Sequence, residues 1–420
     1  MLRIKYMAFA SILLLSSFVP GMSAAEDAAA DSVSLWDTVK HSDASLAPAA
    51  IASRDGWKAV ADEKASFAGD ACLVNNHLAL VLRKGCKGAE WYYRLGDQWV
   101  KGPTLVPVGA NGDKAKAMES LKAVNIKTDE VAVEASFTTE SGKKVTSRYL
   151  VKKGQPIVET QPGDGTEKIC VEIQSRHAII PDLYGGDFVI TAQDVPSPQI
   201  RFPSENMVLH LADNGNAIVM CVWRSRDQQV NMTLDGTGES RAISATEIAY
   251  KKEKDFPVWV AVMAAPEIWY QQKIAELNPV KDRRLDWKVP FCSQWQADYR
   301  RADGLIDSWP LLIKKPSGEF EKPTGKYEGF RLGLNKSRTV TSTARGHFPY
   351  PGWIENDTAY LRRSTFEGHK EILYKEEGSI VIYPFQRIDK SPAGVFGALE
   401  VLSEALKDTP EARLPEGLPV

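Results

Sequence analysis

The sequence predicts a mainly β protein built around a large antiparallel β-sandwich. Apolar residues share one parity over 131–137 (VAVEASF), and polar residues fill much of the other parity. Gly142 and Gly154 interrupt the runs at short intervals. Short alternating strands separated by glycine turns are typical of an antiparallel meander with one buried face. The continuously apolar run 217–223 (AIVMCVW) predicts a strand covered on both faces.

We expect four segments along the chain. They are a signal peptide over 1–25, a lead-in with short helices over 26–64, the antiparallel sandwich over 65–278, and a smaller β region over 279–420 that ends in a helix over 391–407 and an irregular tail. Asn278-Pro279 and the charged run 281–284 (KDRR) mark the boundary between the last two.

The first residues have the pattern of a secretory leader. Arg3 and Lys5 precede an apolar stretch over 7–19, and small residues follow at 23–25. The stretch is shorter than the roughly 20 residues of a membrane-spanning helix. We therefore expect a secreted or periplasmic protein, cleaved near Ala25 and without a membrane span.

Several further elements follow from local patterns. Short helices are expected over 34–40 and 56–64, and two strands are expected within 72–83 around Asn75-Asn76, because asparagine tolerates positive φ. Pro266 is suited to the first turn of a helix over 267–277. Further strands are expected over 169–173, 229–234, 244–251, 256–264 and 291–300, with a hairpin over 371–385.

The final helix has the clearest start signal in the chain. Ser391 is suited to the N-cap and Pro392 to the first turn. Apolar residues at helical spacing follow, at Val395, Leu399, Leu402 and Leu406.

Composition excludes several functions. The 52 basic and 54 acidic residues are nearly balanced, so no nucleic-acid partner is expected. The five cysteines contain no Cys-x-x-Cys spacing, and we expect them to be mostly small buried residues, with one disulfide of unassigned pairing as the alternative. No zinc, Walker or dinucleotide motif is present, so no cofactor is predicted.

The 11 tryptophans suggest a polysaccharide or glycan partner, because Trp suits ligands with apolar and hydroxyl-bearing faces. The alternative is that most of them fill the sandwich core. The oligomeric state does not follow from the sequence.

The first candidate site lies within 174–188 (QSRHAIIPDLYGGDF). His177 and Tyr184 are candidate catalytic acid and base for β-elimination from a uronate, with Arg176 neutralising the substrate carboxylate. Asp182 and Asp187 are candidate substrate-binding residues, or else turn caps. Their oxygens also suit Ca²⁺, which nothing in the sequence requires.

Rigid aromatic residues form a second candidate set. His347, Tyr350 and Trp353 lie in a segment restricted by proline and glycine, and Trp295 lies in a predicted strand. We expect them to bind substrate by stacking on sugar rings, or else to pin their segments to the core.

Carboxyl pairs provide a glycoside hydrolase alternative, since hydrolysis needs two of them. The candidates are Asp298 with Asp303 or Asp307, and Glu355 with Asp357.

Three stretches resemble a type of large secreted bacterial protein that is β-rich and has no assigned activity. They are 180–187 (IPDLYGGD), 217–223 (AIVMCVW) and 379–387 (SIVIYPFQR). The strand spacing also resembles that of galactose-mutarotase-like domains. That resemblance implies an elongated, supersandwich-like fold of a kind common in carbohydrate-active enzymes.

The sequence thus leads to the hypothesis of a secreted carbohydrate-active protein that acts on or binds a polysaccharide. If it is an enzyme, a lyase is favoured over a hydrolase, because no carboxyl pair stands out. The alternative is a non-catalytic glycan- or protein-binding envelope or surface protein. These alternatives differ in whether Arg176, His177, Tyr184 and the segment 347–353 converge on one groove.

Overall fold

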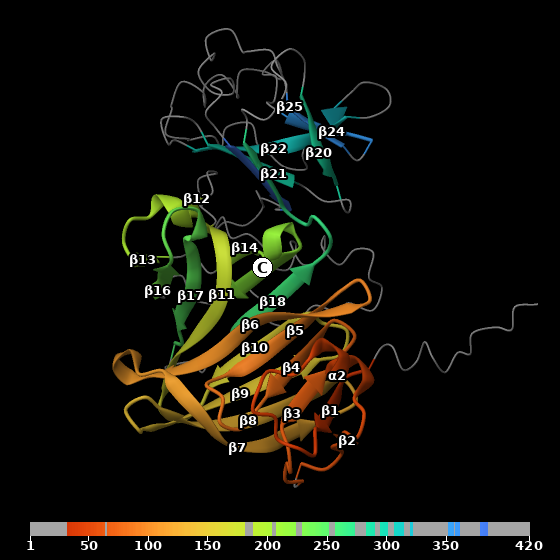
Figure 1. Ribbon diagram of the computed structural model, residues 1–420, viewed down its shortest axis with the longest axis vertical. Coiled ribbons are helices and arrows are strands. Elements are labelled where there is room, and N and C mark those ends of the chain that lie inside the picture. The colour runs from red at the N-terminus through yellow and green to blue at the C-terminus, as the bar shows by residue number, and fades with distance from the viewer. Residues whose placement is uncertain are drawn as a thin grey trace, which may run out of the picture.

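Antiparallel β-structure dominates the protein, as predicted (Figure 1). The computed structural model describes residues 32–63, 65–180, 188–203, 207–223, 229–251, 257–273, 283–289, 295–300, 306–314, 320–321, 352–356, 358–361 and 379–384. Their strands form one sheet of 18 strands and one of eight. The larger sheet folds over itself into two layers that enclose the main core.

The first layer of the sandwich contains the N-terminal strands and a later group. In spatial order it consists of β2 (Lys58–Ala59), β1 (Ser34–Asp37), β3 (Ala71–Val74), β4 (Leu78–Leu82), β5 (Ala89–Leu95), β6 (Gln98–Gly109), β11 (Thr166–Ile180), β17 (Ala242–Ala249), β16 (Gln229–Asp235) and β13 (Gln199–Pro203). The short helix α2 (Pro48–Ser53) places Ile51 against the outer face of its N-terminal half.

The second layer also includes β11. In spatial order it consists of β12 (Phe188–Thr191), β11, β14 (Met207–Ala212), β15 (Ala217–Val222), β18 (Val258–Ala264), β10 (Ile157–Pro162), β9 (Lys144–Lys152), β8 (Glu130–Thr139) and β7 (Ala115–Ile126). Short 3₁₀ turns are η1 (Ala110–Gly112), η2 (Ala192–Asp194), η3 (Asp213–Gly215) and η4 (Gly238–Ser240).

Strand β11 joins the two layers because its partners change along its length. Its first half lies between β6 and β17, and its second half lies between β14 and β12. The register shifts between Glu172 and Ser175, and again before His177. Such irregularities bend a strand and increase its twist, which lets one strand serve both layers.

The main core lies between the layers. Trp91, Phe137, Tyr149 and Trp223 are among its largest buried side chains. The prediction that 217–223 is covered on both faces is confirmed. Cys221 of β15 packs into this core, whereas Met220 packs on the opposite side, where a second cluster begins.

The smaller sheet covers that opposite side. It consists of β19 (Tyr270–Lys273), β26 (Ser379–Pro384), β21 (Trp295–Arg300), β22 (Ile306–Lys314), β23 (Phe320–Glu321), β24 (Gly352–Glu355), β25 (Thr358–Leu361) and β20 (Arg283–Lys288). Val381 and Tyr383 of β26 pack against the second layer, whereas Ile380 and Ile382 pack into the smaller sheet's own core. Alternation along one strand thus joins the two sheets.

Three of the expected helices are wrong. Residues Ser34–Asp37 form strand β1, because they pair along β3, and within 56–64 Lys58–Ala59 forms strand β2. Residues 266–269 form a turn and bend, and Tyr270–Lys273 forms β19, which pairs with β26 more than 100 residues later. Tertiary pairing therefore overrides the helical signals.

The remaining expectations concern two strands, the cysteines and the two ends of the chain. The two strands around Asn75-Asn76 are confirmed as β3 and β4. Cys72, Cys170 and Cys221 are buried thiols, as expected, and Cys86 is a partly exposed free thiol. The leader over 1–25 and the helix over 391–407 lie outside the described residues.

Candidate functional site

An open groove lies on the outer face of the first layer, over β11, β17, β16 and β13. It has a volume of about 630 Å³. Its lining residues are Asn111, Gly112, Lys114, Lys168, Gln199, Ile200, Arg201, Asn231, Met232, Thr233 and Glu247. Pockets for small apolar ligands are lined mostly by hydrophobic and aromatic side chains. This lining is mostly polar and charged, so the groove suits a hydrated, polar ligand.

Strand register arranges the polar side chains of the groove in a row. Arg201 of β13 pairs with Asn231 of β16, and Asn231 pairs with Glu247 of β17. Directly opposed residues on antiparallel strands share a face of the sheet, and neighbouring strands lie about 4.8 Å apart. A guanidinium, an amide and a carboxylate therefore project from three adjacent strands. Glu247 pairs in turn with Cys170 of β11, whose thiol pKa is raised to about 12 by burial.

Two lysines share the carboxylate of Glu247. Lys168 Nζ lies 3.1 Å from Oε2 and Lys114 Nζ lies 3.4 Å from Oε1. Burial acts to lower the pKa of Lys114, but the surrounding negative charge, including that of Glu247, raises it above the ordinary value. Lys114 therefore carries its ammonium charge in the groove at neutral pH.

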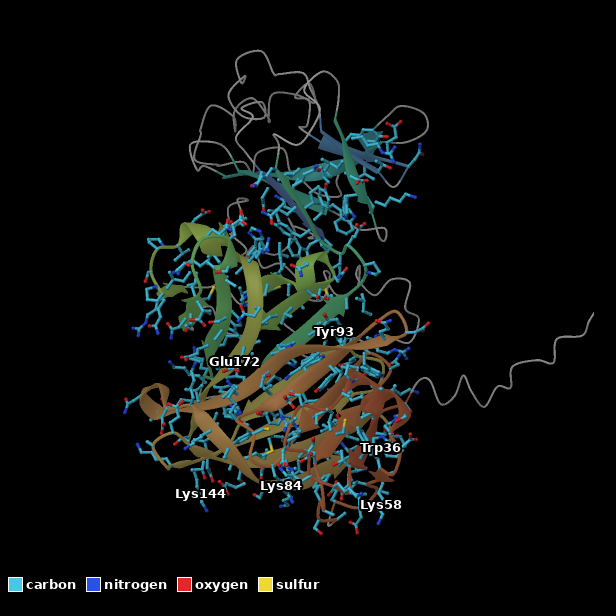
Figure 2. The ribbon with its side chains drawn as sticks, in the orientation of Figure 1. Trp36, Lys58, Lys84, Tyr93, Lys144 and Glu172 are labelled. Atoms are coloured by element: carbon cyan, nitrogen blue, oxygen red, sulfur yellow. The ribbon has the colours of Figure 1, made fainter. Side chains whose placement is uncertain are left out.

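A second cavity extends the groove toward β6. It has a volume of about 460 Å³ and shares Lys114 and Thr233 with the first cavity. Lys87 Nζ lies 2.7 Å from Glu172 there. Glu172 lies opposite Thr104 where β11 pairs with β6. Figure 2 shows Glu172 in the middle of the molecule and Lys144 well away from it on the lower edge of the sandwich. The groove therefore runs across the strands, from β6 to β13.

The connection between β6 and β7 positions Lys114. Asn111 and Gly112 adopt positive φ values of 60° and 79°, which reverse the chain within η1. The backbone N–H of Gly109 donates to the carbonyl of Asp113 at 2.9 Å, and the Asp113 carboxylate accepts a 2.6 Å hydrogen bond from Thr139 Oγ1. Lys114 thus extends from a well-braced turn.

The structure places His177 in a buried position between the two sheets, outside both cavities. Its side chain is 2% exposed. Its Nδ1 lies 3.1 Å from Thr191 Oγ1 and its Nε2 lies 3.0 Å from Gln271 Oε1 of β19. Its ring also packs edge-on against Trp269, with centroids 6.0 Å apart. These contacts correct the expected catalytic role, because Nδ1 is engaged with Thr191 of β12 and Nε2 with Gln271 of β19.

Arg176 does not accompany His177. Arg176 is exposed whereas His177 is buried, as expected of neighbouring residues on a strand, whose side chains point to opposite faces. Tyr184, Asp182 and Asp187, the other members of this predicted cluster, lie outside the described residues, so their expected roles stay predictions.

The structure also corrects the sugar-stacking role that was expected of Trp295. It is 1% exposed and packs in the core of the smaller sheet, with the Trp287 ring centroid 5.0 Å away. It fills that core and presents no face to a sugar. Trp353 belongs to β24, where it pairs with Tyr360. His347 and Tyr350 lie outside the described residues.

The structure describes Asp298 and Asp307, two of the residues considered as carboxyl pairs for hydrolysis. Asp298 is 2% exposed and pairs with Val381, so it faces the sandwich together with that residue. Asp307 pairs with Tyr299 rather than with Asp298. Burial separates Asp298 from solvent and from both cavities. Asp303 and Asp357 lie outside the described residues.

Sequence reasoning missed the groove residues Lys114, Lys168, Arg201 and Glu247. Each of them looks like an ordinary solvated charge in its local sequence. The available signal was parity, because Lys168 and Glu172 alternate with the apolar Ile169 and Val171. Parity identifies the outer face, but only strand pairing brings the four residues together.

No group of three potential metal-ligating side chains occurs within the described ranges. The expected Ca²⁺ ligands Asp182 and Asp187 are not among those ranges. No helix in the described part of the chain is long and apolar enough to cross a membrane.

No family model matches the chain, and no curated protein matches it. Several solved structures are similar to parts of it, among them two enzymes. An α-N-acetylgalactosaminidase from Bifidobacterium bifidum, in complex with GalNAc, aligns with 46% of this chain and 35% of its own length, at 10% identity and a TM-score of 0.32. A heparan sulfate lyase mutant from Pedobacter heparinus aligns with 63% of this chain and 45% of its own length, at 11% identity and a TM-score of 0.29. The alignments thus span less than half of either protein.

Proposed function

We propose that the protein binds a polysaccharide along the groove on the outer face of the first layer. The row formed by Arg201, Asn231 and Glu247 carries this proposal. A guanidinium donates hydrogen bonds, a carboxylate accepts them, and an amide does both. Sugar hydroxyls donate and accept, so they satisfy all three groups at once.

The length of the groove favours a chain of sugars over a single one. The two cavities share Lys114 and Thr233, and their lining extends from Gly102 of β6 to Arg201 of β13. Four strand spacings separate β6 from β13, about 19 Å in all. A ligand that fills this length contains several linked pyranose rings.

The geometry supports binding better than catalysis. Among the described lining residues there is no histidine or tyrosine to move a proton. His177 is buried and bonded at both ring nitrogens. Glu247 and Glu172 each form ion pairs with lysine, which suits a positioning role. A polysaccharide ligand also agrees with the secretory leader expected over 1–25.

Affinity electrophoresis tests the proposal. The full mature chain is run through gels that contain soluble polysaccharides of different backbones. Thr233 lines both cavities, so Thr233→Trp fills the groove at its centre. Thr138→Trp, on β8 of the other layer, is the matched control. We expect at least one polysaccharide to retard the native protein and the control, and to retard Thr233→Trp much less.

Two results contradict the proposal. One is that no polysaccharide retards the native chain. The other is that Thr233→Trp, with a native circular dichroism spectrum, is retarded as strongly as the control. Incubation with uronate polysaccharides adds a test for catalysis, because elimination creates an unsaturated product that absorbs ultraviolet light. We expect no such absorbance.

A further inference from the structure

We infer that the groove selects an acidic polysaccharide and holds its anionic groups at two positions, one at Lys114 and Lys168 and one at Arg201. The inference rests on the proposed function and adds the chemical class of the ligand. The two cavities together are lined by four cationic side chains and three acidic ones. The whole chain carries a net charge of −2, so the groove has the opposite sign.

The first anion position follows from the shared carboxylate. Lys168 and Lys114 lie 3.1 and 3.4 Å from the oxygens of the single Glu247. One negative charge cannot neutralise two ammonium groups. Their side chains are only 25% and 31% exposed, so both are held in place and partly desolvated. A ligand carboxylate or sulfate that bridges them forms charge-assisted hydrogen bonds.

Arg201 provides the second position. Its side chain is exposed at the β13 end of the groove, and none of the described residues forms an ion pair with it. The planar guanidinium binds carboxylate and sulfate through two parallel hydrogen bonds. Asn231, the cross-strand neighbour of Arg201, supplies an amide beside that position.

The spacing of the two positions fits a polymer. Glu247, whose carboxylate contacts both lysines of the first position, lies two strand spacings from Arg201, about 10 Å, which is the scale of about two linked pyranose rings. A polysaccharide with a charge on every second sugar therefore meets both positions. The described lining contains no aromatic side chain on which a neutral sugar ring stacks. Charge is thus the main recognition feature of this groove.

Matched polymers test the inference by isothermal titration. One pair is polygalacturonate and its methyl ester, and the other is dextran sulfate and dextran, so the members of each pair share a sugar backbone and differ in whether it carries anionic groups. We expect at least one acidic member to bind the native protein about tenfold tighter than its neutral partner, as hydrogen bonds to charged groups imply. Added NaCl weakens that binding by screening.

Two variants connect the effect to the groove. Arg201→Gln keeps a polar side chain but removes the charge, and we expect it to weaken acidic-polymer binding about tenfold. Lys144→Gln removes an exposed charge from β9, away from the groove, and serves as the control. It is expected to bind like the native protein.

The outcomes separate the two proposals. Equal affinity within both pairs overturns the inference and leaves polysaccharide binding intact. Absence of binding to all four polymers and to every polysaccharide in the gel panel overturns the proposed function as well. Acidic binding that Arg201→Gln and Thr233→Trp do not weaken overturns the assignment to this groove. Discrimination within one pair alone supports the inference and identifies the anion as carboxylate or sulfate.

Discussion

Lys168 Nζ lies 3.1 Å from Oε2 of Glu247, across neighbouring strands β11 and β17. Lys114 Nζ lies 3.4 Å from the other oxygen of the same carboxylate. Glu247 therefore lies between the side chains of Lys114 and Lys168, which an acidic ligand is proposed to approach. Its side chain is 15% exposed, so replacing it alters the groove without opening the core.

Replacing Glu247 by Gln should strengthen binding of an acidic polysaccharide. The substitution keeps the side chain's size and removes the negative charge that competes with the ligand for Lys114 and Lys168. We expect a severalfold lower dissociation constant for polygalacturonate by isothermal titration. Partly exposed ion pairs contribute only about 0–1 kcal/mol, so the free energy of unfolding should change little. Weaker binding by a folded Glu247→Gln variant contradicts this arrangement.

Replacing His177 by Ala should destabilise the fold without affecting the groove. The change removes hydrogen bonds to Thr191 and Gln271 and an edge-on contact with Trp269. Unpaired buried groups cost about 1–3 kcal/mol, and the aromatic pair adds about 1 kcal/mol. Urea denaturation should therefore show a loss of about 2–4 kcal/mol. Unchanged stability would contradict the joining role that we assign to His177.

The free energy of unfolding should depend on Glu90 in acid. Arg83 Nε lies 2.6 Å from Glu90 Oε2, and Lys101 Nζ lies 2.9 Å from Oε1. Burial alone acts to raise the pKa of Glu90, but hydrogen bonds from Arg83, Ser45 and Lys101 lower it from 4.5 to about 2. The ionised form therefore stabilises the folded state above pH 4.5, and this contribution is lost as the pH falls toward about 2.

Urea denaturation of Glu90→Gln measures that contribution. Removing one partner of a buried ion pair should cost about 3 kcal/mol at neutral pH. The difference from the native protein should shrink at about pH 3, where the carboxyl of the unfolded chain is already protonated. The exposed Glu134→Gln is the control. An equal difference at both pH values is the result that this explanation does not allow.

His210 should contribute a separate pH dependence. It is fully buried on β14, and burial lowers its pKa from 6.5 to about 4. Because the unfolded chain binds this proton more readily, the folded state loses stability as the pH falls from 6.5 toward 4. Between pH 4 and 6.5 the free energy of unfolding of the native protein should therefore rise with pH. In His210→Gln this rise should be smaller, by up to about 1.4 kcal/mol per pH unit. An unchanged slope in urea denaturation contradicts a buried neutral imidazole.

The sandwich was predictable because its strands carry their own pattern. The parity of Val131, Val133 and Phe137 identifies a buried face whichever strand pairs with it. The helix expected over 267–277 shows the limit of local signals. Its first residues form a turn and a strand instead, because Tyr270–Lys273 pairs with β26 more than 100 residues later. That pairing leaves no trace in the local sequence.

The groove lay beyond sequence reasoning for the same reason. Arg201, Asn231 and Glu247 become neighbours only through the registers of β13, β16 and β17. Arg176 and His177, which the sequence analysis placed in one cluster, do not share a site. They are adjacent positions of β11, so their side chains project from opposite faces. Closeness along the chain is therefore a poor guide to a shared site in a β protein.

Hydrogen–deuterium exchange of the full mature chain, with and without polygalacturonate, tests the central claim most directly. Binding along the groove should slow exchange in β13, β16 and β17 and in the turn at 110–114, while β7 and β8 on the other layer stay unchanged. Protection that is confined to the smaller sheet, in a complex that forms under the same conditions, would contradict the assignment of this groove as the polysaccharide site.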